Sequence, residues 1–224
     1  MKPVLSFTFS FFLFVLIANL SLALSNDAVE PVLDVTGNPI FPGGKYYIFP
    51  VSQDDDTYGG GLRLGKTGDS ECEVTVLQDD NIVIDSIPVK FSIAGPEISP
   101  GIIFTGMPIE TEFTKKPSCV ESSKWLIFVD DVIEKACIGI GGPENYPHFK
   151  TVNGTFHIEK HESGFGYKLA YCVKDSDVCL DIGRSRSGNV TEEGGVRLNL
   201  THQVAYAVQF IDVTPFEDKI KSVA

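Results

Sequence analysis

Short apolar runs recur along the chain after its first 25 residues, and each run is bounded by Gly, Pro, Asn or Asp. Many alternate between apolar and polar residues, as at 72–76 and 156–159, a pattern that turns one face of a strand inward and the other toward water. Helical spacing with capping residues is nearly absent. About a dozen strands at intervals of ~8–12 residues predict an all-β sandwich or barrel. The expected strands are 45–51, 61–67, 72–78, 87–93, 101–106, 109–114, 124–131, 154–161, 167–173, 178–183, 196–200 and 206–213.

The mature chain is predicted to form one domain. No linker interrupts residues 25–213, and a chain of 224 residues can bury a sizeable core without a metal. The segments GGKYYIFP, KWLIFVDD and NGTFHIEK resemble one another weakly, which suggests three similar units. Residues 214–224 are expected to form a tail beyond the last strand.

The N-terminus predicts export. Residues 1–24 contain one Lys, an apolar stretch from Phe7 to Leu20 and small residues after it, as a secretory signal peptide does. The stretch is short for a transmembrane anchor and has no basic residues after it, so we expect cleavage between Ala23 and Asn26 and a secreted protein with no membrane contact afterwards. The formal charge of −12 also argues against binding to nucleic acid.

Secretion gives meaning to the five cysteines, Cys72, Cys119, Cys137, Cys172 and Cys179. In an oxidising compartment four would pair and one would remain, and composition alone does not choose the odd one. Cys172 and Cys179 enclose a polar loop that a local bridge could close. A zinc site is disfavoured because no Cys-x-x-Cys pair occurs.

Three Asn-x-Ser/Thr sequons follow the predicted cleavage point, at Asn153, Asn189 and Asn199. The first two have Gly and polar neighbours typical of exposed turns, so they are the favoured glycan sites. Asn199 lies within an expected strand, where strand pairing would partly shield it.

No constellation of residues indicates an enzyme. Gly68-Asp69-Ser70 lacks the following glycine of a serine nucleophile loop and is better explained as a turn. His157 and His161 would lie on a strand end and a turn and be solvated, and the run 54–56 of three Asp lacks the alternating oxygen ligands of a calcium loop. We therefore expect no catalytic residue, metal or cofactor.

The segment Val32–Ile40, followed by Gly43–Ile48, resembles the N-terminal signature of the plant Kunitz family, the soybean trypsin inhibitor type that includes miraculin-like proteins. The resemblance continues in order through the mature chain, for example at Tyr167–Cys172, Cys179–Gly183 and Val208–Phe210. It implies a β-trefoil, in which twelve strands in three pseudo-repeats form a barrel with a hairpin cap.

The resemblance also implies a disulfide framework. The two bridges of the family would be Cys72–Cys119 and Cys172–Cys179, which leaves Cys137 free. Cys137 would then be a small buried hydrophobe, or alternatively the partner in an intermolecular bridge.

The activity implied is inhibition of a serine-type endopeptidase or carboxypeptidase by a monomeric protein, exported to the apoplast or the vacuole. Family members present a stiff convex loop that fills the active site of the protease like a substrate, and the residue before the scissile bond selects the target. The alternative is a non-inhibitory binding or storage protein, similar to miraculin-like relatives.

Two segments are candidates for the loop. One alignment places the scissile bond within the segment of Gly101, Ile102 and Ile103, and an ungapped alignment from Cys72 places it at Pro96-Glu97. Neither offers Arg or Lys, so this loop is not expected to inhibit trypsin strongly. Lys174, between Cys172 and Cys179, is the second candidate because a short stapled loop would expose a basic residue.

Overall fold

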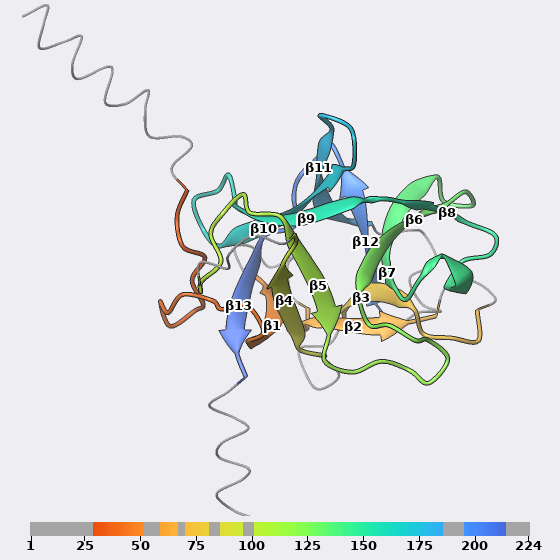
Figure 1. The fold of residues 1–224 in the computed structure, drawn as a ribbon, viewed down its shortest axis with the longest axis horizontal. Coiled ribbons are helices and arrows are strands. Elements are labelled where there is room, and N and C mark those ends of the chain that lie inside the picture. Colours follow the sequence, from red (N-terminus) through yellow and green to blue (C-terminus); the bar gives the residue numbers. More distant parts are fainter. Residues whose placement is uncertain are drawn as a thin grey trace, which may run out of the picture. The chain divides into compact units, whose positions relative to one another are not determined.

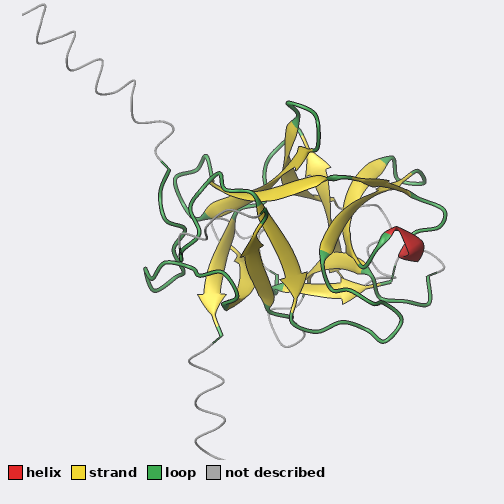
Figure 2. Ribbon diagram, in the orientation of Figure 1, coloured by secondary structure: helices red, strands yellow, loops and turns green. Residues whose placement is uncertain are grey.

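The computed structural model describes residues 29–51, 59–66, 70–80, 86–95, 101–185 and 195–213. These residues contain thirteen strands and one short 3-10 helix, Pro143–Asn145, which Figure 2 shows as the single red turn. The predicted all-β class is confirmed. No helix in the described ranges is long and apolar enough to span a bilayer. The predicted signal peptide (1–24) and tail (214–224) lie outside the described residues.

The strands belong to the compact unit Pro31–Ala224. Alternation of buried and more exposed side chains, clearest in the first strand, follows the alternation of the sequence. The strands are β1 (Lys45–Pro50), β2 (Leu62–Gly65), β3 (Thr75–Asp79), β4 (Val89–Ile93), β5 (Ile109–Phe113), β6 (Trp125–Asp130), β7 (Lys135–Ile140), β8 (Lys150–Val152), β9 (Gly154–Lys160), β10 (Tyr167–Val173), β11 (Cys179–Ser185), β12 (Gly195–Thr201) and β13 (Val208–Asp212).

Six strands close into a barrel. Neighbouring strands pair in the order β13-β1-β4-β5-β9-β10, and Tyr167 of β10 pairs with Val208 of β13 to complete the ring. Figure 1 shows β13, β1, β4 and β5 side by side in this arrangement. Closure leaves no free edge on the ring, and it fixes the ends of each strand. The segment between β4 and β5 is therefore held at both ends by barrel strands.

Three hairpins, β2–β3, β6–β7 and β11–β12, form the cap. Their inner strands meet each other, because β3 pairs with β7 and both pair with β12. Gly139 of β7 leaves room for the ring of Tyr146 and for the residue before β3, since an added methyl group would clash with the Tyr146 hydroxyl and lie 2.9 Å from the carbonyl oxygen of Val74. The barrel and its three-hairpin cap confirm the predicted β-trefoil.

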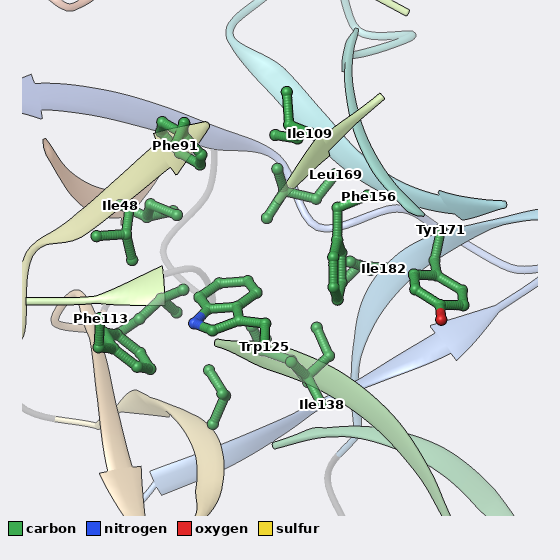
Figure 3. Close-up of a cluster of buried hydrophobic side chains, with 14 of the residues drawn as sticks. Ile48, Phe91, Ile109, Phe113, Trp125, Ile138, Phe156, Leu169, Tyr171 and Ile182 are labelled. Atoms are coloured by element: carbon green, nitrogen blue, oxygen red, sulfur yellow. The ribbon is translucent and has the colours of Figure 1, made fainter. Parts of the chain in front are cut away.

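The core lies between the barrel and the cap. Trp125 of β6 packs in an edge-to-face contact on Phe156 of β9 and in a tilted contact on Phe113 of β5, with ring centroids 5.7 and 5.4 Å apart. Figure 3 shows the indole surrounded by side chains from both parts of the fold. The residues around it include Ile48, Phe91, Ile109, Phe113, Ile138, Phe156, Leu169 and Ile182.

Three sequence predictions of detail were wrong. The sequence pattern missed β7 and β8, and the run 101–106 forms no strand, only an isolated bridge at Phe104. The three weakly similar segments also do not occupy equivalent places. KYYIFP and GTFHIEK are barrel strands β1 and β9, whereas WLIFVD is β6 in the cap. The strands equivalent to β1, each a barrel strand that directly precedes a cap hairpin in the chain, are β5 and β10.

Candidate functional site

The segment 94–108 connects β4 to β5 and is the first candidate loop. Its base is closed by the pairing of Ile93 with Ile109 and by a hydrogen bond of 3.0 Å from the amide of Ala94 to the carbonyl of Pro108. Residues 96–100, and with them the alternative bond Pro96-Glu97, lie outside the described residues. The description resumes at Gly101.

Gly101 and Ile102 lie at the exposed side of this segment. Gly101 is exposed and has a φ of +80°, a left-handed conformation that glycine adopts without strain. The side chain of Ile102 is half-buried, so part of it faces the solvent. These two residues can contact a protein that approaches the loop.

Ile103 does not share that role, and its inclusion among the contact residues was wrong. It is fully buried in the core. Its amide donates to the carbonyl of Ile40 at 3.0 Å, and its carbonyl accepts from the amide of Val32 at 2.8 Å. The N-terminal segment therefore holds the backbone of Ile103 from both sides, and its side chain cannot enter a protease pocket.

The C-terminal half of the loop is anchored on β9 as well. The amide of Gly106 donates to the carbonyl of Ile158 at 2.9 Å, and Nδ1 of His157 lies 2.9 Å from the carbonyl oxygen of Gly106. Nε2 of His157 lies 3.0 Å from Oγ1 of Thr155. His157 is thus a support of the loop, a role that was not predicted, because its side chain was expected to be solvated.

His161 is also not solvated as predicted. Its side chain is 11% exposed, with Nδ1 2.8 Å from Oγ of Ser163 and Nε2 3.3 Å from the carbonyl oxygen of Ala205. No group of three or more His, Cys, Asp or Glu in the described ranges could hold a metal ion. Both histidines therefore serve as hydrogen-bonding partners that fix turns.

The turn between β10 and β11 carries Lys174, the second candidate. Cys172 and Cys179 face each other in the strand pair and form a disulfide. Within it the amide of Val173 donates to the carbonyl of Val178 at 2.9 Å, and Asp175 has a positive φ of 58°. Lys174 is exposed. The hairpin combines a rigid base with an accessible basic side chain.

The disulfide prediction is confirmed. Cys72 pairs with Cys119, which ties the segment before β3 to the segment after β5, and Cys172 pairs with Cys179. Cys137 is free and fully buried in β7. Burial raises the pKa of its thiol to about 11, against a usual value of 9.0, because the thiolate would lose its hydration. This burial fits the interpretation of Cys137 as a core residue.

The three sequons have different surroundings. Asn153 lies exposed between β8 and β9. Asn189 lies outside the described residues, as do the Asp run 54–56 and the pair Gly68-Asp69. Asn199 is only 5% exposed, and its side chain donates to the carbonyl of Leu200 inside the cap. A glycan has no room there, so its candidacy was wrong.

A cavity of about 200 Å³ lies among β5, β6 and the start of β9. Trp125, Phe156 and Tyr171 contribute aromatic walls, and the ion pair between Lys124 and Glu110, 2.7 Å long, belongs to its rim. Asn153 is among the lining residues. The cavity therefore leaves open space beside this sequon.

Residues 32–212 match the family model Kunitz_legume, described as "Trypsin and protease inhibitor". The "Kunitz-type trypsin inhibitor-like 1 protein" of Pisum sativum is 62% identical over 94% of both chains. "Subtilisin inhibitor CLSI-II" of Canavalia lineata is 49% identical over 87% of this chain and 98% of its own length. A crystal structure of a Kunitz type trypsin inhibitor from Cicer arietinum is 66% identical, with a TM-score of 0.76 over 82% of this chain and 99% of that one.

The fold, the disulfides and these similarities define the class of protein: a β-trefoil of the protease inhibitor type. The chain belongs to the Kunitz legume family of trypsin and protease inhibitors.

Proposed function

We propose that the protein inhibits a serine-type endopeptidase that accepts apolar side chains, and that the loop 94–108 is its binding segment. The observation that carries this proposal is the composition of the loop: no Lys or Arg occurs between Ala94 and Pro108, and Ile102 is the partly exposed apolar residue beside Gly101. In a complex of this loop with trypsin, the buried Asp of the protease pocket would have no basic partner. In a complex with an apolar pocket, burial of Ile102 would add to the binding free energy. The similarity to a subtilisin inhibitor supports the same target class.

An endopeptidase suits the geometry better than a carboxypeptidase. The loop is an internal segment closed at Ile93 and Ile109, so it offers a chain interior and no free carboxylate. The bonds from Ile103 and Gly106 to neighbouring segments restrict the base of the loop before binding. Less conformational entropy is then lost on binding, so a rigid loop gains affinity without burying a larger contact area.

Export is part of the proposal. The signal-like sequence of residues 1–24 supports entry into the secretory pathway, toward the apoplast or the vacuole, and two disulfides are typical of proteins that mature in an oxidising compartment. We further propose that the protein acts as a monomer and has no catalytic activity of its own.

The test is a panel of subtilisin, elastase, chymotrypsin and trypsin against the full mature protein and the variant Ile102→Arg. We expect inhibition of at least one apolar-preferring protease, and a loss of about tenfold to a hundredfold in affinity when Ile102 is replaced, the value of one buried apolar side chain. Val132→Arg is the matched control, because Val132 is 89% exposed in the β6–β7 turn and gains the same charge. No slowing of any protease at micromolar protein would instead favour the non-inhibitory binding or storage function.

Lys174 is a second candidate contact, for a trypsin-like protease, because its hairpin is both exposed and stapled. If it acts, Lys174→Gln abolishes trypsin inhibition and leaves inhibition by the loop 94–108 unchanged. Lys115→Gln, at another exposed lysine, is the control. Trypsin inhibition that survives Lys174→Gln would exclude this site.

A further inference from the structure

The sequon residue Asn153 and the candidate contact Lys174 lie side by side, although they are far apart in sequence. The amide of Lys174 donates to the carbonyl of Asn153 at 2.9 Å. Gly154 packs tightly against the same hairpin, since an added methyl group would lie 2.2 Å from the carbonyl oxygen of Cys172. The disulfide between Cys172 and Cys179 fixes the hairpin in turn. Asn153 and the Lys174 hairpin therefore keep fixed positions relative to each other in the folded protein.

The side chain of Asn153 is free to carry a substituent. It is exposed, and no hydrogen bond to it occurs within the described part of the chain. The cavity beside β5 and β9 leaves open space on one side of it. Of the two sequons in the described residues, Asn153 alone meets these conditions, because the side chain of Asn199 is buried.

We propose that Asn153 carries an N-linked glycan and that this glycan covers the Lys174 hairpin, so that glycosylation decides whether Lys174 can engage a protease. This proposal rests on the proposed export of the chain and extends the proposed function at Lys174, the second candidate contact. A glycan is bulky and hydrated, and the backbone of the residue that would carry it is hydrogen-bonded to the backbone of Lys174. The glycosylated protein then binds through the loop 94–108, and the unglycosylated protein has the basic hairpin available as well.

The experiment uses the full chain, with its N-terminal segment, secreted from a eukaryotic host that attaches N-glycans. Three forms are compared: the unchanged protein, Asn153→Gln, which removes the sequon, and Thr155→Ser, which keeps both the sequon and the hydroxyl beside His157. Peptide mass spectrometry measures glycan occupancy at Asn153. Shielding is measured as the modification of Lys174 by a polyethylene glycol succinimidyl ester, relative to that of exposed Lys115 in the same molecule.

We expect an occupied Asn153, and polymer modification of Lys174 several-fold lower in the unchanged and Thr155→Ser proteins than in Asn153→Gln. Acetylation by a small succinimidyl ester should be similar in all three forms, because it tests the lysine itself and not the access of a large molecule. An unmodified Asn153, or equal polymer modification of Lys174 with and without the glycan, overturns the proposal. Neither readout requires inhibition, so a failure of the proposed function would be seen separately in the protease panel.

Discussion

Cys137 shows how burial decides the chemistry of one residue. A thiol reacts through its thiolate, and the pKa of Cys137 is raised to about 11 because its side chain is fully buried in β7. At pH 8 the thiolate fraction is then about a hundredfold smaller than at the usual value of 9.0, in addition to the steric block. An intermolecular bridge through Cys137 would require the cap to open.

We predict that Ellman's reagent labels no thiol in the native protein at pH 8 and one thiol per chain in 6 M guanidinium. Between pH 7 and pH 9 the native protein should remain unlabelled, because this range lies below the pKa of about 11 and the side chain has no access to solvent. Cys137→Ala is the control and should give no label in either condition. Stoichiometric labelling before unfolding would show that the thiol is accessible.

At the loop 94–108, neighbouring residues have opposite fates that sequence pattern alone could not assign. Ile102 and Ile103 are chemically identical and adjacent, yet Ile102 is half-buried and Ile103 is in the core. The difference comes from the segment Val32–Ile40, which bonds the backbone of Ile103 from a distance of more than sixty residues in sequence. The sequence predicted where the loop is, and the tertiary partners determine which of its side chains are presented.

At the scale of the elements, strands were predictable where apolar and polar residues alternate and less so where they do not. β1 and β9 alternate and were predicted. β7 reads KACIGI, with a glycine that suggests a break, but Gly139 is a strand residue and is required by the close approach of Tyr146 and Val74. The run 101–106 is apolar enough for a strand, yet its long-range backbone bonds are divided between the N-terminal segment and β9 and form no ladder.

The two disulfides close chain segments of different length, so their removal should have different costs. The cysteines of the pair Cys172–Cys179 are 7 residues apart and those of Cys72–Cys119 are 47 apart. From the loop-closure entropy of the unfolded chain, we expect losses of about 2.5 and about 4 kcal/mol in the free energy of unfolding, respectively.

Urea unfolding of the two double Cys→Ser variants measures this difference. In the Cys172/Cys179 variant the Lys174 hairpin should also become less rigid, so trypsin should cleave it faster there. The Cys72/Cys119 variant should show no faster cleavage of this hairpin when the two variants are compared at equal free energy of unfolding. Equal losses of stability in the two variants would contradict the entropic origin of the difference.

At the scale of the whole molecule, barrel and cap share one core and should unfold together. Trp125, the single tryptophan, belongs to the cap strand β6 and packs on Phe113 and Phe156 of the barrel. Its fluorescence therefore reports on contact between the two parts, while far-UV circular dichroism reports on all strands.

The class of fold was evident from the sequence because it depends on the spacing of many strands, an average that single errors such as β7 do not change.

A buried ion pair within the cap gives a test of this cooperativity. Arg197 of β12 contacts Asp130 of β6 at 2.8 Å, with side chains 13% and 5% exposed, and Asp130 also accepts from the amide of Val132. Removing the carboxylate leaves a buried guanidinium without this partner, so Asp130→Ala should cost about 3 kcal/mol. Glu110→Ala breaks the exposed pair with Lys124 and should cost less than about 1 kcal/mol, because solvent screens that pair.

In Asp130→Ala we expect the fluorescence and dichroism transitions to shift together to lower urea. Since Trp125 senses the contact between barrel and cap, an early fluorescence transition with an unchanged dichroism midpoint would instead mean that the cap detaches from a barrel that remains folded.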